Sequence, residues 1–139
     1  METINHEYYV SFEVARLLKE VGFDWEIKTF YFMGQIGETM LGDAKNHNFS
    51  NQFISAPTLD VAQRWLREVK HLDISIHYDP TIKSQPYVYF IYDVEEKFND
   101  ILGIISPITH SYSDGYFYKY EEAQEEGIKK ALEIINKGE

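Results

Sequence analysis

The chain has 139 residues, of which 44% are hydrophobic and 26% charged, so it is long enough to bury the core of one folded domain. It contains no cysteine, which excludes disulfide bonds, thiolate metal ligands and cysteine nucleophiles. The formal net charge is −10 and no basic cluster is present. Direct nucleic-acid binding is therefore not expected, because it requires a basic face that neutralises phosphates.

Two features of the sequence indicate a cytoplasmic protein without membrane association. The N-terminus has neither the basic nor the apolar region of a signal peptide. The most apolar stretch, Ile101–Ile108, is far shorter than a membrane-spanning helix and contains Pro107.

Aromatic residues are unusually frequent: eleven Tyr, nine Phe and two Trp make up 16% of the chain. Tyr-rich strands favour a pleated, half-buried surface, which explains part of this excess. Exposed Tyr and Trp side chains are also good anchors for partners. We therefore expect some of the rings to lie at the surface.

The first predicted helix begins after Ser11, a suitable N-cap, and ends at Gly22. Its apolar positions follow the i, i+3, i+4, i+7 spacing of one helical face: Val14, Leu17, Leu18 and Val21. Residues 25–32 are rich in aromatic and β-branched residues and predict a strand. Residues 34–52 contain several Gly and Asn and predict a long loop or a loose hairpin, which can be a functional segment.

A short strand at Phe53 and Ile54 is followed by a second predicted helix, with Thr58 as its N-cap. Two further strands are predicted at residues 72–78 and 86–94, joined by a polar hairpin loop over residues 79–85. One more strand is expected around residues 103–105. The last predicted helix covers about residues 121–136, with Glu residues near its start and Lys residues near its end, as the helix dipole favours.

This order of elements predicts one α+β domain over residues 1–139. Because neighbouring strands are joined by short loops, we expect an antiparallel sheet of about four to five strands. The three helices are expected to pack against this sheet.

One strand carries a row of side chains that could bind a metal. Alternation along residues 71–79 places four His and Asp residues on the same face: His71, Asp73, His77 and Asp79. Ligands two residues apart on a strand can share a metal ion. An ordinary polar, solvent-facing side of an antiparallel sheet gives the same pattern, so these residues are weak candidates.

The sequence predicts no catalytic residues and no cofactor. Ser75 and His77 share the polar face of the 71–79 strand, but same-face neighbours are about 6.6 Å apart along a strand. A nucleophile and its base must touch, so we do not expect this pair to act together.

Three segments of the chain resemble one group of proteins: Val10–Asp24, Ala56–Glu68, and Tyr120–Ala123 with the helix that follows. This group consists of small proteins of unknown function from Bacteroides-type gut bacteria, often encoded in prophages or other mobile elements. The resemblance implies a small accessory protein of bacterial or phage origin, and it implies no chemistry or site residues.

The leading hypothesis is therefore a small, non-enzymatic accessory protein that binds another protein or a second copy of itself. One alternative is an enzyme or metal-dependent protein with its site on the 34–52 loop or on the 71–79 strand face. The other is an acidic inhibitor of phage type that mimics DNA, which the net charge of −10 would suit.

Overall fold

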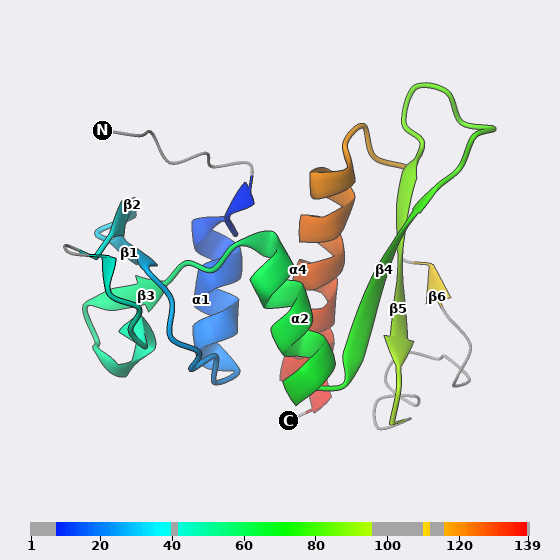
Figure 1. The fold of residues 1–139 in the computed structure, drawn as a ribbon. Coiled ribbons are helices and arrows are strands. Elements are labelled where there is room, and N and C mark those ends of the chain that lie inside the picture. The colour runs from blue at the N-terminus through cyan, green and yellow to red at the C-terminus, as the bar shows by residue number, and fades with distance from the viewer. Residues whose placement is uncertain (1–7, 40–41, 96–109, 112–115, 139) are drawn as a thin grey trace. The chain divides into compact units, whose positions relative to one another are not determined.

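The computed structural model describes residues 8–39, 42–95, 110–111 and 116–138. Contacts along the backbone divide the chain into two compact units, Met1–Ala62 and Gln63–Glu139. Each unit contains an antiparallel sheet (Figure 1). The α+β class is confirmed, but the expected single sheet of four to five strands is wrong. The expectation of a single domain over residues 1–139 stays a prediction.

Helix α1 (Phe12–Glu20) opens the first unit with the ends that the sequence predicts. The Ser11 hydroxyl accepts a hydrogen bond from the Val14 N–H at 3.2 Å, which satisfies one of the free donors of the first turn. Gly22 adopts φ 96°, a left-handed conformation that lets the chain leave the helix at little cost.

The first sheet has the strand order β2-β1-β3. Its strands are β1 (Thr29–Phe32), β2 (Gln35–Glu38) and β3 (Phe53–Ser55). The strand predicted from residue 25 begins only at Thr29, because Ile27 makes an isolated bridge with Lys45 instead of a continuous ladder. Residues 34–52, predicted as a long loop or a loose hairpin, contain β2, which pairs with β1, and the 3-10 helix η3 (His47–Phe49).

The second sheet has the order β4-β5-β6, with strands β4 (Leu72–Tyr78), β5 (Tyr87–Asp93) and β6 (His110–Ser111). Helix α2 (Leu59–Val69) precedes β4, and the division between the two units falls inside it. Helix α4 (Tyr120–Gly138) ends the second unit. The predicted strand around residues 103–105 lies outside the described residues.

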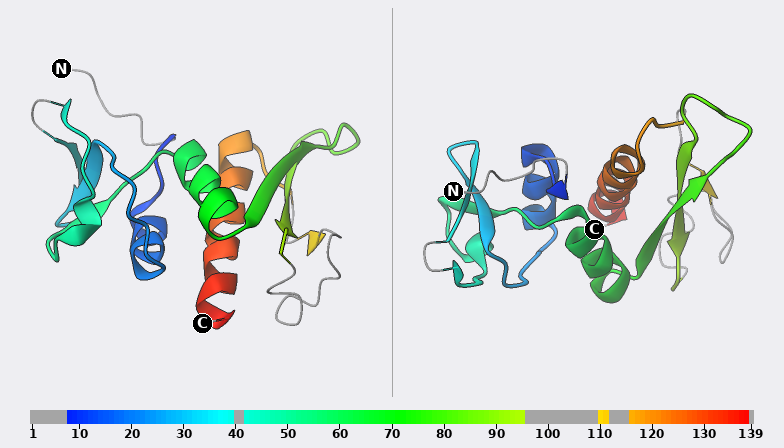
Figure 2. Two further views of the ribbon diagram at one scale, coloured as in Figure 1. Left: turned by 60° about the horizontal axis from the view of Figure 1, so that its bottom comes forward. Right: turned by 45° about the horizontal axis from the view of Figure 1, so that its top comes forward.

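Helix α4 lies along one face of β4 and β5 (Figures 1 and 2). Gly127 of α4 faces these two strands at close range. A Cβ atom placed there would lie 2.7 Å from Cγ2 of Ile74 and 3.2 Å from Cγ of Tyr89, well inside normal contact distances. Only glycine fits between this helix and this sheet without displacing their side chains.

Two glutamine side chains connect three elements of the second unit. The buried Gln124 donates from Nε2 to Oε1 of Gln63 at 2.7 Å, and Gln63 donates from Nε2 to the Ile74 carbonyl at 2.6 Å. The bonds run from α4 through α2 to β4, a strand at the edge of its sheet. The bond from Gln63 supplies the Ile74 carbonyl of this edge strand with a donor from outside the sheet.

No helix in the described part of the chain is long and apolar enough to cross a membrane.

Gly127→Ala is expected to destabilise the second unit. A helix-interior Ala gains about 1 kcal/mol over Gly in propensity, but overpacking against Ile74 and Tyr89 costs about 1–3 kcal/mol, so we expect a net loss near 1 kcal/mol. Urea unfolding followed by circular dichroism measures the change. Gly138→Ala, the same substitution at an exposed site of the same helix, is the control and should cause no loss. Equal stability of Gly127→Ala and the wild type would contradict the close contact.

Candidate functional site

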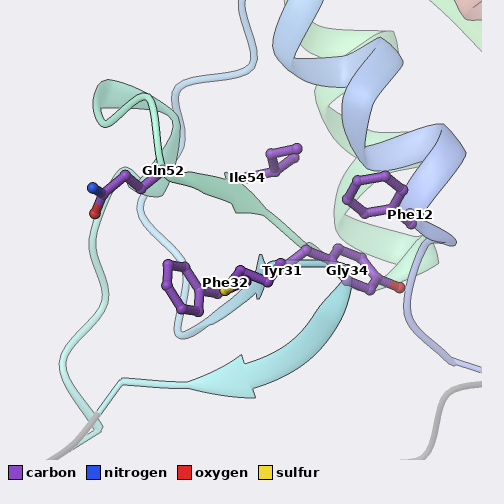
Figure 3. Close-up of a pocket in the computed structure, with 7 residues that line it drawn as sticks. Phe12, Tyr31, Phe32, Gly34, Gln52 and Ile54 are labelled. Atoms are coloured by element: carbon purple, nitrogen blue, oxygen red, sulfur yellow. The ribbon is translucent and has the colours of Figure 1, made fainter.

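The first unit has an open, apolar pocket with a volume of about 460 Å³. It is lined by residues from α1, β1, the β1–β2 turn and the start of β3: Phe12, Tyr31, Phe32, Met33, Gly34, Gln52 and Ile54. Figure 3 shows Phe12 beside Tyr31, and Gln52 at the opposite end, pointing away from Phe12. The volume is in the range of pockets that hold small molecules or a partner's side chain.

Tyr31 fixes one side of the pocket. Its hydroxyl donates to the Val10 carbonyl at 2.7 Å and so connects β1 to the residues just before α1. Phe12, the first residue of α1, meets the Tyr31 ring edge to face with the ring centres 5.4 Å apart. The cap at Ser11 and this ring contact hold Phe12 partly exposed at the mouth of the pocket.

The β1–β2 turn supplies another part of the lining. Phe32 and Gln35 are paired, so the turn consists of two residues, Met33 with φ 52° and Gly34 with φ 81°. Two positive φ angles in a two-residue hairpin loop are typical of a type I′ turn, which favours Asn-Gly. A left-handed residue other than glycine costs about 1–2 kcal/mol. Met33 occupies this position although its side chain is 86% exposed and adds nothing to the core.

Aromatic rings support β1 from the other face of its sheet. Phe53 stacks on Phe32 at 5.0 Å and meets Phe30 edge to face at 5.1 Å. Phe30 also contacts the imidazole of His47 at 4.9 Å. Phe32 can take part in this cluster and line the pocket because it ends β1.

His47 is a buried, neutral member of this support. Its Nε2 lies 3.0 Å from the Ile27 carbonyl, which can only accept, so Nε2 carries the proton. Its backbone N–H donates to the Ser55 hydroxyl at 3.1 Å. Burial lowers the pKa of His47, the bond to Ile27 raises it, Lys45 lowers it, and the net pKa is below the usual value.

The lining of the pocket can bind but offers no reaction chemistry. Its seven residues include no charged side chain, and the one hydroxyl, on Tyr31, is committed to the Val10 carbonyl. The amide of Gln52 is the remaining polar group. The pocket therefore suits an uncharged, apolar group, such as an aromatic or aliphatic side chain.

The four predicted metal candidates are not brought together. His71 lies 3.4 Å from a carboxylate oxygen of Glu95, and Asp79 accepts hydrogen bonds from the N–H and hydroxyl of Thr81. Asp73 is half-buried on β4, and His77 is exposed. In the described residues, no three His, Asp or Glu side chains lie close enough to share a metal ion. The metal site stays a prediction that this geometry does not support.

The side chains of Ser75 and His77 lie closer together than the sequence analysis predicted. The Ser75 hydroxyl lies 2.9 Å from Nε2 of His77, although the spacing of strand residues indicated that the two could not touch. The side chains lean toward each other along the strand, which a backbone spacing does not capture. His77 also meets Phe90 edge to face at 4.8 Å, which orients its ring.

Sequence reasoning did not identify the pocket residues. Met33-Gly34 between two β-rich runs was an available hairpin signal, because a residue followed by Gly often forms a two-residue loop. Phe12 was also informative, because it lies outside the apolar stripe of its helix.

We expect the stability of the first unit to fall as the pH is lowered from about 7.5 to about 5.5. Because the pKa of His47 is lower in the folded chain, the unfolded chain binds more protons in this range, and protonation favours unfolding. His47 contributes fully to the free energy of unfolding above the usual pKa of histidine. This contribution is lost as the pH falls toward the lower pKa that His47 has in the folded chain. Urea midpoints measured across this range test it.

In His47→Gln the fall in stability with pH should be smaller, since the titrating group is gone while an amide can still donate to the Ile27 carbonyl. Phe49→Ser, at the exposed neighbour in the same turn, should keep the pH dependence of the wild type. An unchanged pH dependence in His47→Gln would show that another group causes it.

No protein-family model, curated protein or solved structure is significantly similar to this chain. The resemblance to small mobile-element proteins of gut bacteria therefore stays a prediction. Functional conclusions depend on the geometry of the chain itself.

Proposed function

We propose that the chain is a small, non-enzymatic accessory protein that binds another protein, or a second copy of itself, through exposed aromatic and apolar side chains. The observation that carries this proposal is the pocket of the first unit, which is apolar, open and without charged lining. Such a site gains free energy by burying an apolar side chain, at about 25 cal/mol for each Å² removed from water.

Met33, an exposed residue of the pocket lining, is the strongest indication that the pocket is a binding surface. Methionine is flexible and polarisable and is frequent at surfaces that adapt to a partner. Here it stands at the turn position that prefers Asn and is almost fully exposed, so neither the turn nor the core explains it. A residue that costs folding free energy and lines an exposed pocket is best explained by a contact with a partner.

Met33→Asn separates binding from folding. Asn-Gly suits a type I′ turn, so this variant should be at least as stable as the wild type. It should nevertheless bind its partner more weakly, because it removes an apolar side chain from the rim of the pocket. Light scattering after size-exclusion chromatography measures self-association, and affinity capture from lysate of the source cells detects other partners.

Phe49→Ser is the matched control, because Phe49 is 92% exposed in the same unit but does not line the pocket. It should behave as the wild type in both measurements. A wild-type chain that stays monomeric and captures no protein would contradict the proposed function. If Met33→Asn binds as tightly as the wild type, the pocket is not the binding site of the proposed function.

One observation favours the alternative of an enzyme on the 71–79 strand face, namely the contact between Ser75 and His77. A histidine that accepts the serine proton can activate the hydroxyl. In the described residues, no carboxylate is hydrogen-bonded to the other nitrogen of His77. The third member of a triad, which would orient the imidazole, is therefore lacking there.

A fluorophosphonate probe distinguishes this alternative. If Ser75 is activated, intact mass spectrometry should show one adduct on the wild type and none on Ser75→Ala or His77→Gln. If the wild type gains no adduct, the contact is structural and the enzyme alternative loses its support.

A further inference from the structure

A row of three tyrosines lies at one end of the second sheet. Tyr78 and Tyr87 meet at 5.5 Å between ring centres, and Tyr87 and Tyr120 meet at 6.1 Å, both edge to face. Tyr78 is 63% exposed and Tyr120 is 42% exposed, while Tyr87 between them is half-buried. We call these three residues the tyrosine row.

Three elements hold the row in place. Tyr78 and Tyr87 form the last pair of the β4–β5 ladder, next to the hairpin loop. Tyr120 is the first residue of α4, and the start of this helix lies near that end of the sheet (Figure 2). The backbone of Tyr87 also exchanges hydrogen bonds of 3.1 and 2.7 Å with Phe117, three residues before Tyr120. The rings are therefore presented by regular structure on both sides.

Carboxylates lie next to the row at its α4 end. At the other end Asp79 follows Tyr78 in the sequence but lies on the opposite face of the strand by alternation; hydrogen bonds from the hydroxyl and the N–H of Thr81 lower its pKa, so it is charged at neutral pH. Glu121 follows Tyr120, and the first two turns of α4 contain four glutamates and no basic residue. Lys119 and Lys83 are the neighbouring bases in sequence. Glu122 accepts a hydrogen bond from the Lys119 N–H and belongs to the helix cap.

Charge decides which occupant suits this surface. The chain has a net charge of −10, and residues 91–139 contain 11 acids and 5 bases. A second copy would bring the same excess of negative charge to the contact, which opposes association. A nucleic acid would be repelled for the same reason. A basic segment is attracted both by the carboxylates and by the faces of the tyrosine rings, which bind cations.

We propose that the tyrosine row binds a basic, arginine- or lysine-rich segment of a partner protein. The guanidinium or ammonium groups stack on the exposed rings of Tyr78 and Tyr120, and Glu121 at the start of α4 pairs with a neighbouring cation. This surface lies in the second unit and does not involve the pocket of the first unit. The inference therefore adds a second binding surface and does not depend on what the pocket binds.

Fluorescence anisotropy with a labelled octa-arginine peptide tests the proposal on the full chain. The wild type should bind the peptide, more weakly as the salt concentration rises, and should not bind octa-glutamate. The double variant Tyr78→Ser, Tyr120→Ser keeps every charge, and its affinity should fall about five-fold or more, because each exposed cation–ring contact contributes a factor of about two to five.

Three controls make the result specific. Tyr78→Phe, Tyr120→Phe keeps the ring faces and should stay within about two-fold of the wild type. Tyr8→Ser removes an exposed tyrosine elsewhere and should have no effect. Met33→Asn should bind octa-arginine as the wild type does, so failure of the pocket and failure of the row can be told apart. Circular dichroism confirms that each variant is folded.

Two results would overturn the proposal. If the wild type does not bind octa-arginine at low salt, the row is not a site for basic segments. If the double Ser variant binds as tightly as the wild type, the attraction is diffuse charge alone and the tyrosines do not take part.

Discussion

The second unit depends on how closely α4 can approach β4 and β5, and this distance is set at Gly127. No side chain fits there between Ile74 and Tyr89, so the backbone of the helix rests almost directly on the sheet. Tyr120 lies about two helical turns earlier on the same helix. The contact at Gly127 therefore also sets how far the start of α4 stands from the sheet, where Tyr120 meets Tyr87. In this way packing in the core positions the exposed rings of the tyrosine row.

In the first unit the corresponding constraint is the connection between β1 and the start of α1. The bond from the Tyr31 hydroxyl to the Val10 carbonyl fixes the strand relative to the helix, and Phe12 and Met33 both line the pocket. The rings of Phe30, Phe53 and His47 fill the other side of the sheet. The Tyr31 hydroxyl is hydrogen-bonded to the Val10 carbonyl, and these three rings pack on one another. The pocket therefore keeps an apolar lining.

The sequence predicts its helices well and the pairing of its strands poorly, for a physical reason. Helix ends are local: Ser11 and Thr58 cap their helices through bonds to residues three positions away. Strand pairing is not local, and nothing in the alternation of residues 25–32 shows that β1 pairs with β3 at Phe30 and Ser55 rather than with β4. The pocket was missed because its residues come from four segments. The contact between Ser75 and His77 was missed because it depends on side-chain conformation.

The aromatic excess has two different uses in the structure. Phe23 and Trp65 are fully buried and serve the core, as in any domain of this size. Among the described residues, some of the exposed rings stand where regular structure ends, such as Phe32 at the β1–β2 turn and Tyr78 at the end of the β4–β5 ladder. Their surroundings differ in charge: the pocket is lined without charged side chains, whereas Tyr120 of the tyrosine row begins the acidic first turn of α4. Since ring faces attract both apolar groups and cations, this difference in charge is the reason why we propose a different kind of partner for each surface.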